Sequence, residues 1–145
     1  IKKFNLDFIK PKNIEKEIAD LLAKKKVVAH FSRSMEFGPR ALGNRSILCS
    51  AEDPSINDTL NKRLNRTEFM PFAPAVIDYM AKTYFPKYNK NNPSADYMTI
   101  TYDVDPKYHE ELQAVVHVDG TSRPQIVRKE TTPYYYNIIN ELKSV

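Results

Sequence analysis

Residues 31–48, with the sequence FSRSMEFGPRALGNRSIL, constrain the fold of this chain more than any other stretch. They hold two of the three glycines in the chain, Gly38 and Gly43, with Pro39 between them. Glycine allows backbone conformations that other residues avoid, and apolar runs precede and follow the stretch. The pattern therefore predicts a strand, a turn and a second strand.

We call residues 31–48 the arginine loop, because they hold one acid, Glu36, and three arginines, Arg33, Arg40 and Arg45. Guanidinium groups bind carboxylate and phosphate oxygens through paired hydrogen bonds. The loop is therefore a candidate anion site. Exposed loops also contain arginine and glycine simply because they are solvated and bent, and these residues alone leave both interpretations open.

Part of the arginine loop, residues 38–46, approaches the P-loop pattern of Gly, four residues, Gly, Lys and Ser or Thr. Asn44 stands where the lysine belongs, and Arg45 is inserted before Ser46. These departures exclude a Walker-type NTPase. What remains is the prediction that backbone N–H groups, arginine side chains and Ser46 together hold a phosphate.

The composition is that of one soluble globular domain, with 41% hydrophobic and 28% charged residues in 145. A net charge of +4 suits an anionic small molecule or a nucleic-acid surface and selects neither. The single cysteine, Cys49, follows an apolar run, which predicts a buried, unreactive thiol and a reducing cytoplasm. No stretch reads as a membrane span or a signal peptide. Because the chain begins at Ile1, we expect a piece of a larger protein.

Apolar periodicity predicts helices and strands in mixed order. Helices are expected at residues 13–26, from 53 to 64, at 79–85 and from 132 to 142. Strands are expected at residues 27–31, 45–50, 97–104, 114–118 and 125–128, the last two forming a hairpin-like unit. Two prolines in residues 68–77 exclude a helix and a central strand there and predict an extended crossing segment. The fold class is α/β or α+β, with helices packed on a partly antiparallel sheet.

A second candidate site is the histidine segment, residues 117–125, with the sequence HVDGTSRPQ. On a strand, His117 and Asp119 would point the same way, an arrangement suited to acid–base chemistry or a metal. Because the chain holds only three histidines and one cysteine, we predict no metal site. The turn at Gly120 offers amides to an anion, and Arg123 adds charge. A polar hairpin turn is the alternative, and it explains Asp119 and Gly120.

Residues 35–47, MEFGPRALGNRSI, strongly resemble the signature of carbamoyltransferases of the nodulation and antibiotic-tailoring type. Two further segments resemble blocks of that family in the same order. They are residues 66–74, RTEFMPFAP, which we call the proline segment, and the histidine segment. The resemblance covers residues 27–142, nearly the whole chain.

The resemblance implies that residues 1–145 form a single C-terminal domain of YrdC/Sua5-like fold, an open twisted mixed sheet with flanking helices. An N-terminal Kae1-like domain would belong to the same polypeptide. The implied activity is that of a cytoplasmic O-carbamoyltransferase. Carbamoyl phosphate and ATP, with Mg²⁺, would form a carbamoyl adenylate, and the N-terminal domain would pass the carbamoyl group to an acceptor hydroxyl.

The resemblance also implies site residues. Catalytic roles fall to His117, Asp119 and Arg123. Substrate or nucleotide binding falls to Arg33, Arg40, Asn44, Arg45, Ser46, Arg66, Gly120, Thr121 and Gln125. Glu36 is expected to hold an arginine without touching substrate.

The chain departs from the family pattern in three places. Residues 32–35 read Ser-Arg-Ser-Met where many members have a glycine, and Met70 stands where many have an arginine. A motif that follows the last helix in the family is absent, so we expect a truncated sheet and weakened ligand binding. Two alternatives stay open, a basic RNA-binding module and a non-catalytic scaffold that contacts the N-terminal domain.

Overall fold

The computed structural model describes residues 2–67 and 71–144. Met70, and with it the start of the predicted extended segment, lies outside the described residues. The α-helices are α1 (Ile14–Ala23), α2 (Ser55–Arg63), α3 (Ala81–Tyr84) and α4 (Pro133–Leu142). The 3₁₀ turns are η1 (Lys2–Phe4), η2 (Asp78–Met80), η3 (Pro93–Tyr97) and η4 (Pro106–Tyr108). The strands are β1 (Val28–Phe31), β2 (Arg45–Leu48), β3 (Ala75–Ile77), β4 (Tyr102–Asp103), β5 (Thr121–Ser122) and β6 (Gln125–Val127).

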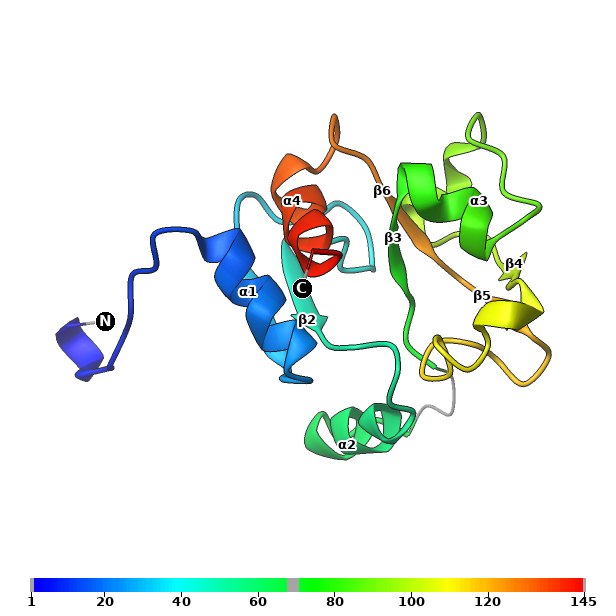
Figure 1. The fold of residues 1–145 in the computed structure, drawn as a ribbon. Coiled ribbons are helices and arrows are strands. Elements are labelled where there is room, and N and C mark those ends of the chain that lie inside the picture. The colour runs from blue at the N-terminus through cyan, green and yellow to red at the C-terminus, as the bar shows by residue number, and fades with distance from the viewer. Residues whose placement is uncertain (1, 68–70, 145) are drawn as a thin grey trace.

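The described strands pair two by two into small open sheets. β1 pairs with β2 and β4 with β5, both antiparallel, whereas β3 and β6 run parallel. Helices flank these pairs (Figure 1). The predicted mixed α/β class with open sheets and flanking helices is therefore confirmed, and the likeness to YrdC stays a prediction.

The parallel pair β3–β6 lies between two hydrophobic clusters (Figure 1). Successive strand residues point to opposite faces, so Ile126 belongs to one cluster and Val127 to the other. The first cluster gathers α3 and the segments around β4 and β5, and it includes the fully buried Phe85. The second joins α1 and α4, which pack against each other, to β2. This central layer brings the histidine segment close to the arginine loop.

The predicted helices exist, with boundaries set by local chemistry. The Asn13 side chain accepts the N–H of Lys16 at 3.0 Å and begins α1. The helix ends earlier than predicted, because Lys25 has a φ of 56°. The Asp53 carboxylate accepts the N–H of Ser55 at 2.9 Å before α2. Thr132 precedes α4 without capping it, because its hydroxyl donates to the Arg128 carbonyl at 3.3 Å.

One strand prediction is wrong in part, and a second is wrong together with the hairpin built on it. Of residues 97–104 only β4 is a strand, because Met98 has a φ of 54° after η3. Tyr102 and Val104 are nevertheless buried. Residues 114–118 form no strand, and the Val115 N–H donates to the Leu112 carbonyl at 2.9 Å to close a turn. The hairpin with residues 125–128 is therefore absent.

Residues 71–74 lead into β3, a strand that the sequence did not predict. Pro74 directly precedes β3, so no N–H of the β3 ladder is lost. The Pro74 carbonyl accepts the N–H of Gln125 at 2.8 Å, which begins the pairing of β3 with β6.

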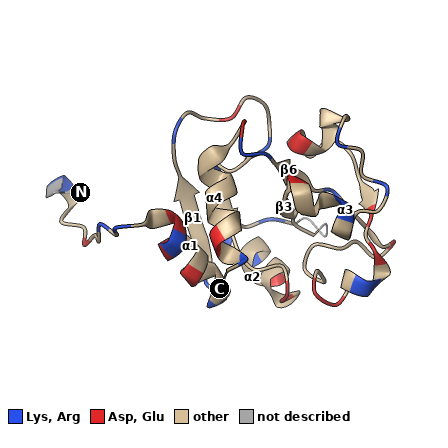
Figure 2. Ribbon diagram, turned by 45° about the horizontal axis from the view of Figure 1, so that its top comes forward, with Lys and Arg blue, Asp and Glu red and all other residues tan. Residues whose placement is uncertain are grey.

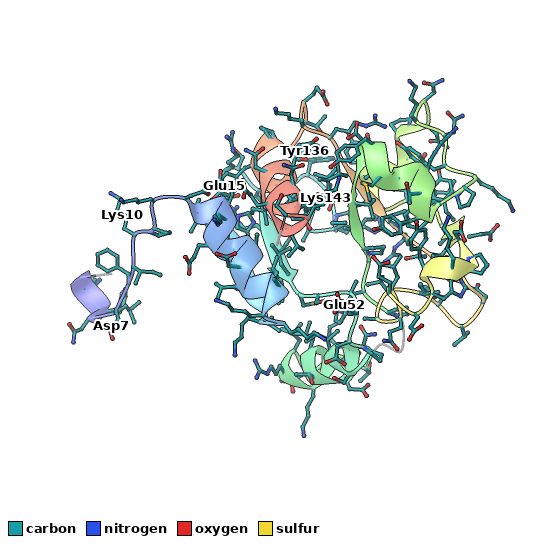
Figure 3. The ribbon with its side chains drawn as sticks, in the orientation of Figure 1. Asp7, Lys10, Glu15, Glu52, Tyr136 and Lys143 are labelled. Atoms are coloured by element: carbon teal, nitrogen blue, oxygen red, sulfur yellow. The ribbon has the colours of Figure 1, made fainter. Side chains whose placement is uncertain are left out.

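Residues 2–12 extend away from the two clusters as an arm (Figures 1 and 3). Figure 3 labels Asp7 and Lys10 on this arm. Its apolar side chains are exposed, Phe8 by 66% and Ile9 by 78%. The described arm holds only η1 and irregular backbone.

Candidate anion site of the arginine loop

The arginine loop is closed at its base by β1 and β2. Phe31 pairs with Arg45, and one further bond joins the Ser32 N–H to the Asn44 carbonyl at 2.9 Å. The predicted strand, turn and strand are thus confirmed. Gly38 and Gly43 have φ angles of 101° and 114°, which side chains other than glycine rarely adopt.

One carboxylate oxygen organises the turn. Glu36 Oε1 accepts the backbone N–H groups of Leu42 at 2.8 Å, Asn44 at 2.7 Å and Arg45 at 3.1 Å. Burial acts to raise the pKa of Glu36, and the backbone hydrogen bonds outweigh it, so the pKa lies below its ordinary value. Glu36 was expected to hold an arginine side chain. It holds backbone instead, because three amides converge where a guanidinium was anticipated.

The turn amides therefore have partners within the loop. The N–H of Gly43 donates to Ser46 Oγ at 3.0 Å, which adds a fourth internal bond. A phosphate could use these amides only by displacing Glu36 or Ser46. The arginine side chains could bind an anion without displacing Glu36 or Ser46, provided that their guanidinium groups are not already bound to other parts of the loop.

Arg45 is engaged by the loop itself. Its guanidinium donates to the carbonyls of Ser32, Asn44 and Arg33, the last at 3.0 Å. It also stacks over the Phe31 ring, 3.6 Å from the centroid. These contacts close the base of the loop, and substrate binding by Arg45 stays a prediction.

The remaining predicted residues of the loop divide by their contacts. Asn44 Nδ2 donates to the Ser34 carbonyl at 3.0 Å, so its side chain also holds the loop together. Arg33 is exposed and has a φ of 46°. Arg40 is half-buried and its guanidinium makes no hydrogen bond or ion pair with the residues that the structure describes. The Arg33 guanidinium likewise makes no hydrogen bond or ion pair with the described residues, so both arginines have donors available, and Arg40 is the less exposed of the two.

Gln125 joins the histidine segment to the arginine loop. Its side chain is 3% exposed and its Nε2 donates to the Leu42 carbonyl at 2.8 Å. Its backbone N–H donates to Pro74, the last residue of the proline segment. The three segments, far apart in the sequence, thus meet at Gln125.

Arg123 lies beside this junction. Its Nε is buried and has no hydrogen-bond partner in the described part of the chain. Arg123 precedes Gln125 by two residues and Arg40 precedes Leu42 by two. Two residues span at most about 7 Å, so the backbone of Arg40 lies within that distance of Leu42, and the backbone of Arg123 within that distance of Gln125.

The turn of the histidine segment is held internally. Asp119 Oδ1 accepts the N–H of Thr121 at 3.0 Å and its hydroxyl at 2.8 Å. These bonds lower the pKa of Asp119, which is exposed. His117 and Asp119 do not share a strand, since the His117 carbonyl accepts the Gly120 N–H at 2.9 Å to close a turn. The polar-turn interpretation therefore explains Asp119, Gly120 and Thr121, and their catalytic or binding roles, like that of His117, stay predictions.

Sequence reasoning missed His30, which is buried beneath the loop. Its Nδ1 lies 2.5 Å from the Gly43 carbonyl, and its ring stacks on Tyr134 with 5.5 Å between centroids. A carbonyl only accepts, so Nδ1 bears the proton and Nε2 is left with no partner among the described residues. The available sequence signal was the two-residue period of the predicted strand, which places His30 on the same face as Val28, and the structure buries His30 there.

Two further predictions concern isolated residues. Arg66 is exposed, and its guanidinium lies 5.2 Å from the centre of the Phe72 ring, within the proline segment. Cys49 is half-buried where a buried thiol was predicted, and this burial raises the pKa of the thiol. Its low reactivity stays a prediction.

The described part of the chain, residues 2–67 and 71–144, contains neither a candidate metal-binding group nor a candidate membrane-crossing helix. No group of three or more His, Cys, Asp or Glu side chains gathers there in a way that could hold a metal ion. No helix in this part combines the length and apolarity that crossing a membrane requires.

The family described as "Carbamoyltransferase C-terminus" matches residues 19–145. The chain belongs to this family. It is 34% identical over 142 residues to nodulation protein NolO of Bradyrhizobium diazoefficiens, covering 96% of this chain and 25% of that protein. It is 36% identical over 115 residues to nodulation protein U of Rhizobium tropici, covering 79% of this chain and 19% of that protein.

Relatives also occur in archaea. An uncharacterized protein of Methanocaldococcus jannaschii is 36% identical over 128 residues, which cover 88% of this chain and 20% of that protein. The chain thus spans about a fifth to a quarter of the length of these relatives. All three segments of this carbamoyltransferase C-terminal chain lie within the matched residues.

Proposed function

We propose that this chain is part of an O-carbamoyltransferase and helps to bind carbamoyl phosphate and ATP for the formation of a carbamoyl adenylate. Membership of the carbamoyltransferase family supports the transferase class. The observation that supports the site most is the Gln125–Leu42 hydrogen bond, which joins the loop that carries Arg40 to the segment that carries Arg123. Two cationic groups without other partners in the described chain suit a ligand with several anionic oxygens.

In the proposed reaction, carbamoyl phosphate reacts with water to give carbamate and phosphate. A carbamate oxygen then forms a bond to the α-phosphorus of ATP, and pyrophosphate leaves as the α–β bridging bond breaks. The chain needs no nucleophile for this step. Its contribution is to hold the anions in line and to offset their charge, which Arg40 and Arg123 would do.

Mg²⁺ would enter as the MgATP complex. Because the described residues gather no carboxylate cluster, we expect nucleotide phosphate oxygens to hold the ion. A Kae1-like domain of the same polypeptide would then pass the carbamoyl group to an acceptor hydroxyl. The relatives, four to five times longer than the matched part, leave room for such a domain.

An RNA-binding module is the alternative from a different class. The exposed Phe31 and Phe37 beside the arginines would suit base stacking. Figure 2 shows basic and acidic segments interspersed along the ribbon, however, and not a single basic stripe. We therefore favour the small-molecule proposal.

The test uses the full-length enzyme and follows ATP–pyrophosphate exchange that depends on carbamoyl phosphate. Arg40→Ala and Arg123→Ala should each reduce this exchange by about a hundredfold or more, because each removes an anion contact. Arg63→Ala, an exposed position in the last turn of α2, is the matched control and should retain full exchange. Unchanged exchange in both site variants would contradict the proposal, and tight, salt-sensitive RNA binding without exchange would favour the alternative.

A further inference from the structure

The arginine loop contains an anion of its own. The carboxylate of Glu36 occupies the concave side of the turn and accepts three backbone amides through one oxygen, at 2.7 to 3.1 Å. Converging amides of this kind form the sites at which other proteins bind phosphate. In this loop the anion is covalently part of the chain.

We propose that Glu36 is a positioning residue that fills the amide concavity and fixes the loop conformation from which Arg40 reaches its ligand. The catalytic consequence rests on the proposed function. The structural consequence, a loop ordered by an internal carboxylate, does not.

The residues that Glu36 holds are themselves tied to the rest of the molecule. Leu42 gives its N–H to Glu36 and its carbonyl to Gln125. Arg45 gives its N–H to Glu36, while its guanidinium binds the carbonyls of Ser32 and Arg33 on the opposite side of the loop. Glu36 is thus the common acceptor between the base of the loop and the junction with β6.

Charge explains why a carboxylate suits this position. Glu36 forms no ion pair with the described residues, so its charge is offset by amide dipoles alone. A neutral glutamine can accept these bonds only weakly through its carbonyl oxygen, because it lacks the charge of the carboxylate. Alanine would leave three inward-facing N–H groups without an acceptor.

The backbone between Glu36 and Arg40 includes Gly38, whose Cβ position has no neighbour within 4 Å. This part of the turn is therefore held only at its ends. Without the Glu36 hydrogen bonds, the backbone around Arg40 would sample other conformations, and the Arg40 guanidinium would no longer be held at one position. The expected kinetic effect is a higher KM for carbamoyl phosphate.

The experiment compares Glu36→Ala and Glu36→Gln in the full-length enzyme, with Glu52→Ala as the control. Glu52 is an exposed acid that pairs with Lys25 at 3.4 Å, outside the loop. Hydrogen exchange measured by mass spectrometry reads residues 40–46 directly. Both Glu36 variants should speed exchange there by about tenfold or more, since a charge-assisted bond is lost. The KM for carbamoyl phosphate should rise by about tenfold, with a smaller change in kcat.

Added formate supplies the missing carboxylate. It should slow amide exchange and lower the KM in Glu36→Ala, and it should do neither in Arg40→Ala. Should Glu36→Ala fail to fold, Glu36→Gln retains the side-chain volume and is read by the same two measurements.

Unchanged hydrogen exchange of residues 40–46 in Glu36→Gln would overturn the inference. Faster hydrogen exchange with an unaltered KM for carbamoyl phosphate would overturn it as well. If the wild-type enzyme itself shows no ATP–pyrophosphate exchange that depends on carbamoyl phosphate, the proposed function fails. The hydrogen-exchange result then still decides whether Glu36 orders the loop.

Discussion

The side-chain amide of Gln125 donates a hydrogen bond to the backbone carbonyl of Leu42 at 2.8 Å, across 83 residues of sequence. Gln125 begins β6, and Leu42 lies in the turn held by Glu36. This bond joins two segments that the sequence shows only as separate candidate sites. Its removal should therefore affect both stability and ligand binding.

Gln125→Leu should lower the free energy of unfolding by about 1–3 kcal/mol, because it leaves the Leu42 carbonyl without its donor. Urea unfolding measures the change. The control is Gln113→Leu, which removes a similar bond to the Glu52 carbonyl at an exposed site. The control should alter stability by less than about 0.5 kcal/mol. Equal losses in the two variants would contradict a special role for Gln125.

Gly43→Ala should destabilise the protein more than Gly38→Ala. A Cβ on Gly43 would lie 2.4 Å from Cδ1 of the buried Tyr135, whereas one on Gly38 would meet nothing within 4 Å. Both positions have positive φ, which costs about 1–2 kcal/mol for alanine. The clash should add about 1–3 kcal/mol at Gly43 alone. Thermal unfolding of the pair gives the difference, and a larger loss at Gly38 would show that the packing on Tyr135 is wrong.

Asp96→Asn should cost about 2–3 kcal/mol of unfolding free energy. Arg128 binds the Asp96 carboxylate through Nε at 2.8 Å, and its Nη2 also donates to the Tyr88 hydroxyl and the Lys90 carbonyl. The Arg128 and Asp96 side chains are only 22% and 15% exposed. Urea unfolding measures the loss.

The matched control for that pair is Asp103→Asn. Asp103 pairs with Lys87 at 2.6 Å, but these side chains are 58% and 78% exposed. Solvent screening limits such a pair to less than about 1 kcal/mol. A control that lost as much stability as Asp96→Asn would contradict the assignment of Arg128 to a half-buried network.

The stability contributed by Glu36 should depend on pH. Burial alone would raise the pKa of Glu36, but its backbone hydrogen bonds prevail and lower it from 4.5. A carboxylate with a lowered folded pKa stabilises the protein above its unfolded pKa, and this contribution disappears as pH falls through the folded value. The stability difference between wild type and Glu36→Gln should therefore be constant near neutral pH and should shrink as pH drops below 4.5. Urea unfolding at several pH values measures it, and Gln113→Leu should show no such trend.

Local features of the fold were predictable because neighbours in sequence produce them. The apolar stripe of α4, with Tyr135 and Ile138 buried, follows from helical spacing. The glycines and flanking apolar runs correctly predicted the turn between β1 and β2. The order of the three segments along the chain was enough to indicate the family.

Strand pairing was less predictable, because hydrogen bonds between strands join distant residues. Residues 114–118 have a strand-like composition, yet Ala114 bonds to Ala51 and Val115 closes a turn. β6 consequently pairs with β3 and not with a hairpin neighbour. Which partner a short apolar segment takes depends on packing that its own sequence does not encode.

By itself the sequence determined the helices, the loop with its glycines and arginines, and the carbamoyltransferase family. Only the tertiary structure decided how the arginines differ. Arg45 is engaged by carbonyls of its own loop, whereas Arg40 and the Nε of Arg123 have no hydrogen-bond partner in the described chain. The physical reason is that availability of a donor depends on which acceptors lie within about 3 Å, and folding brings those acceptors from remote residues.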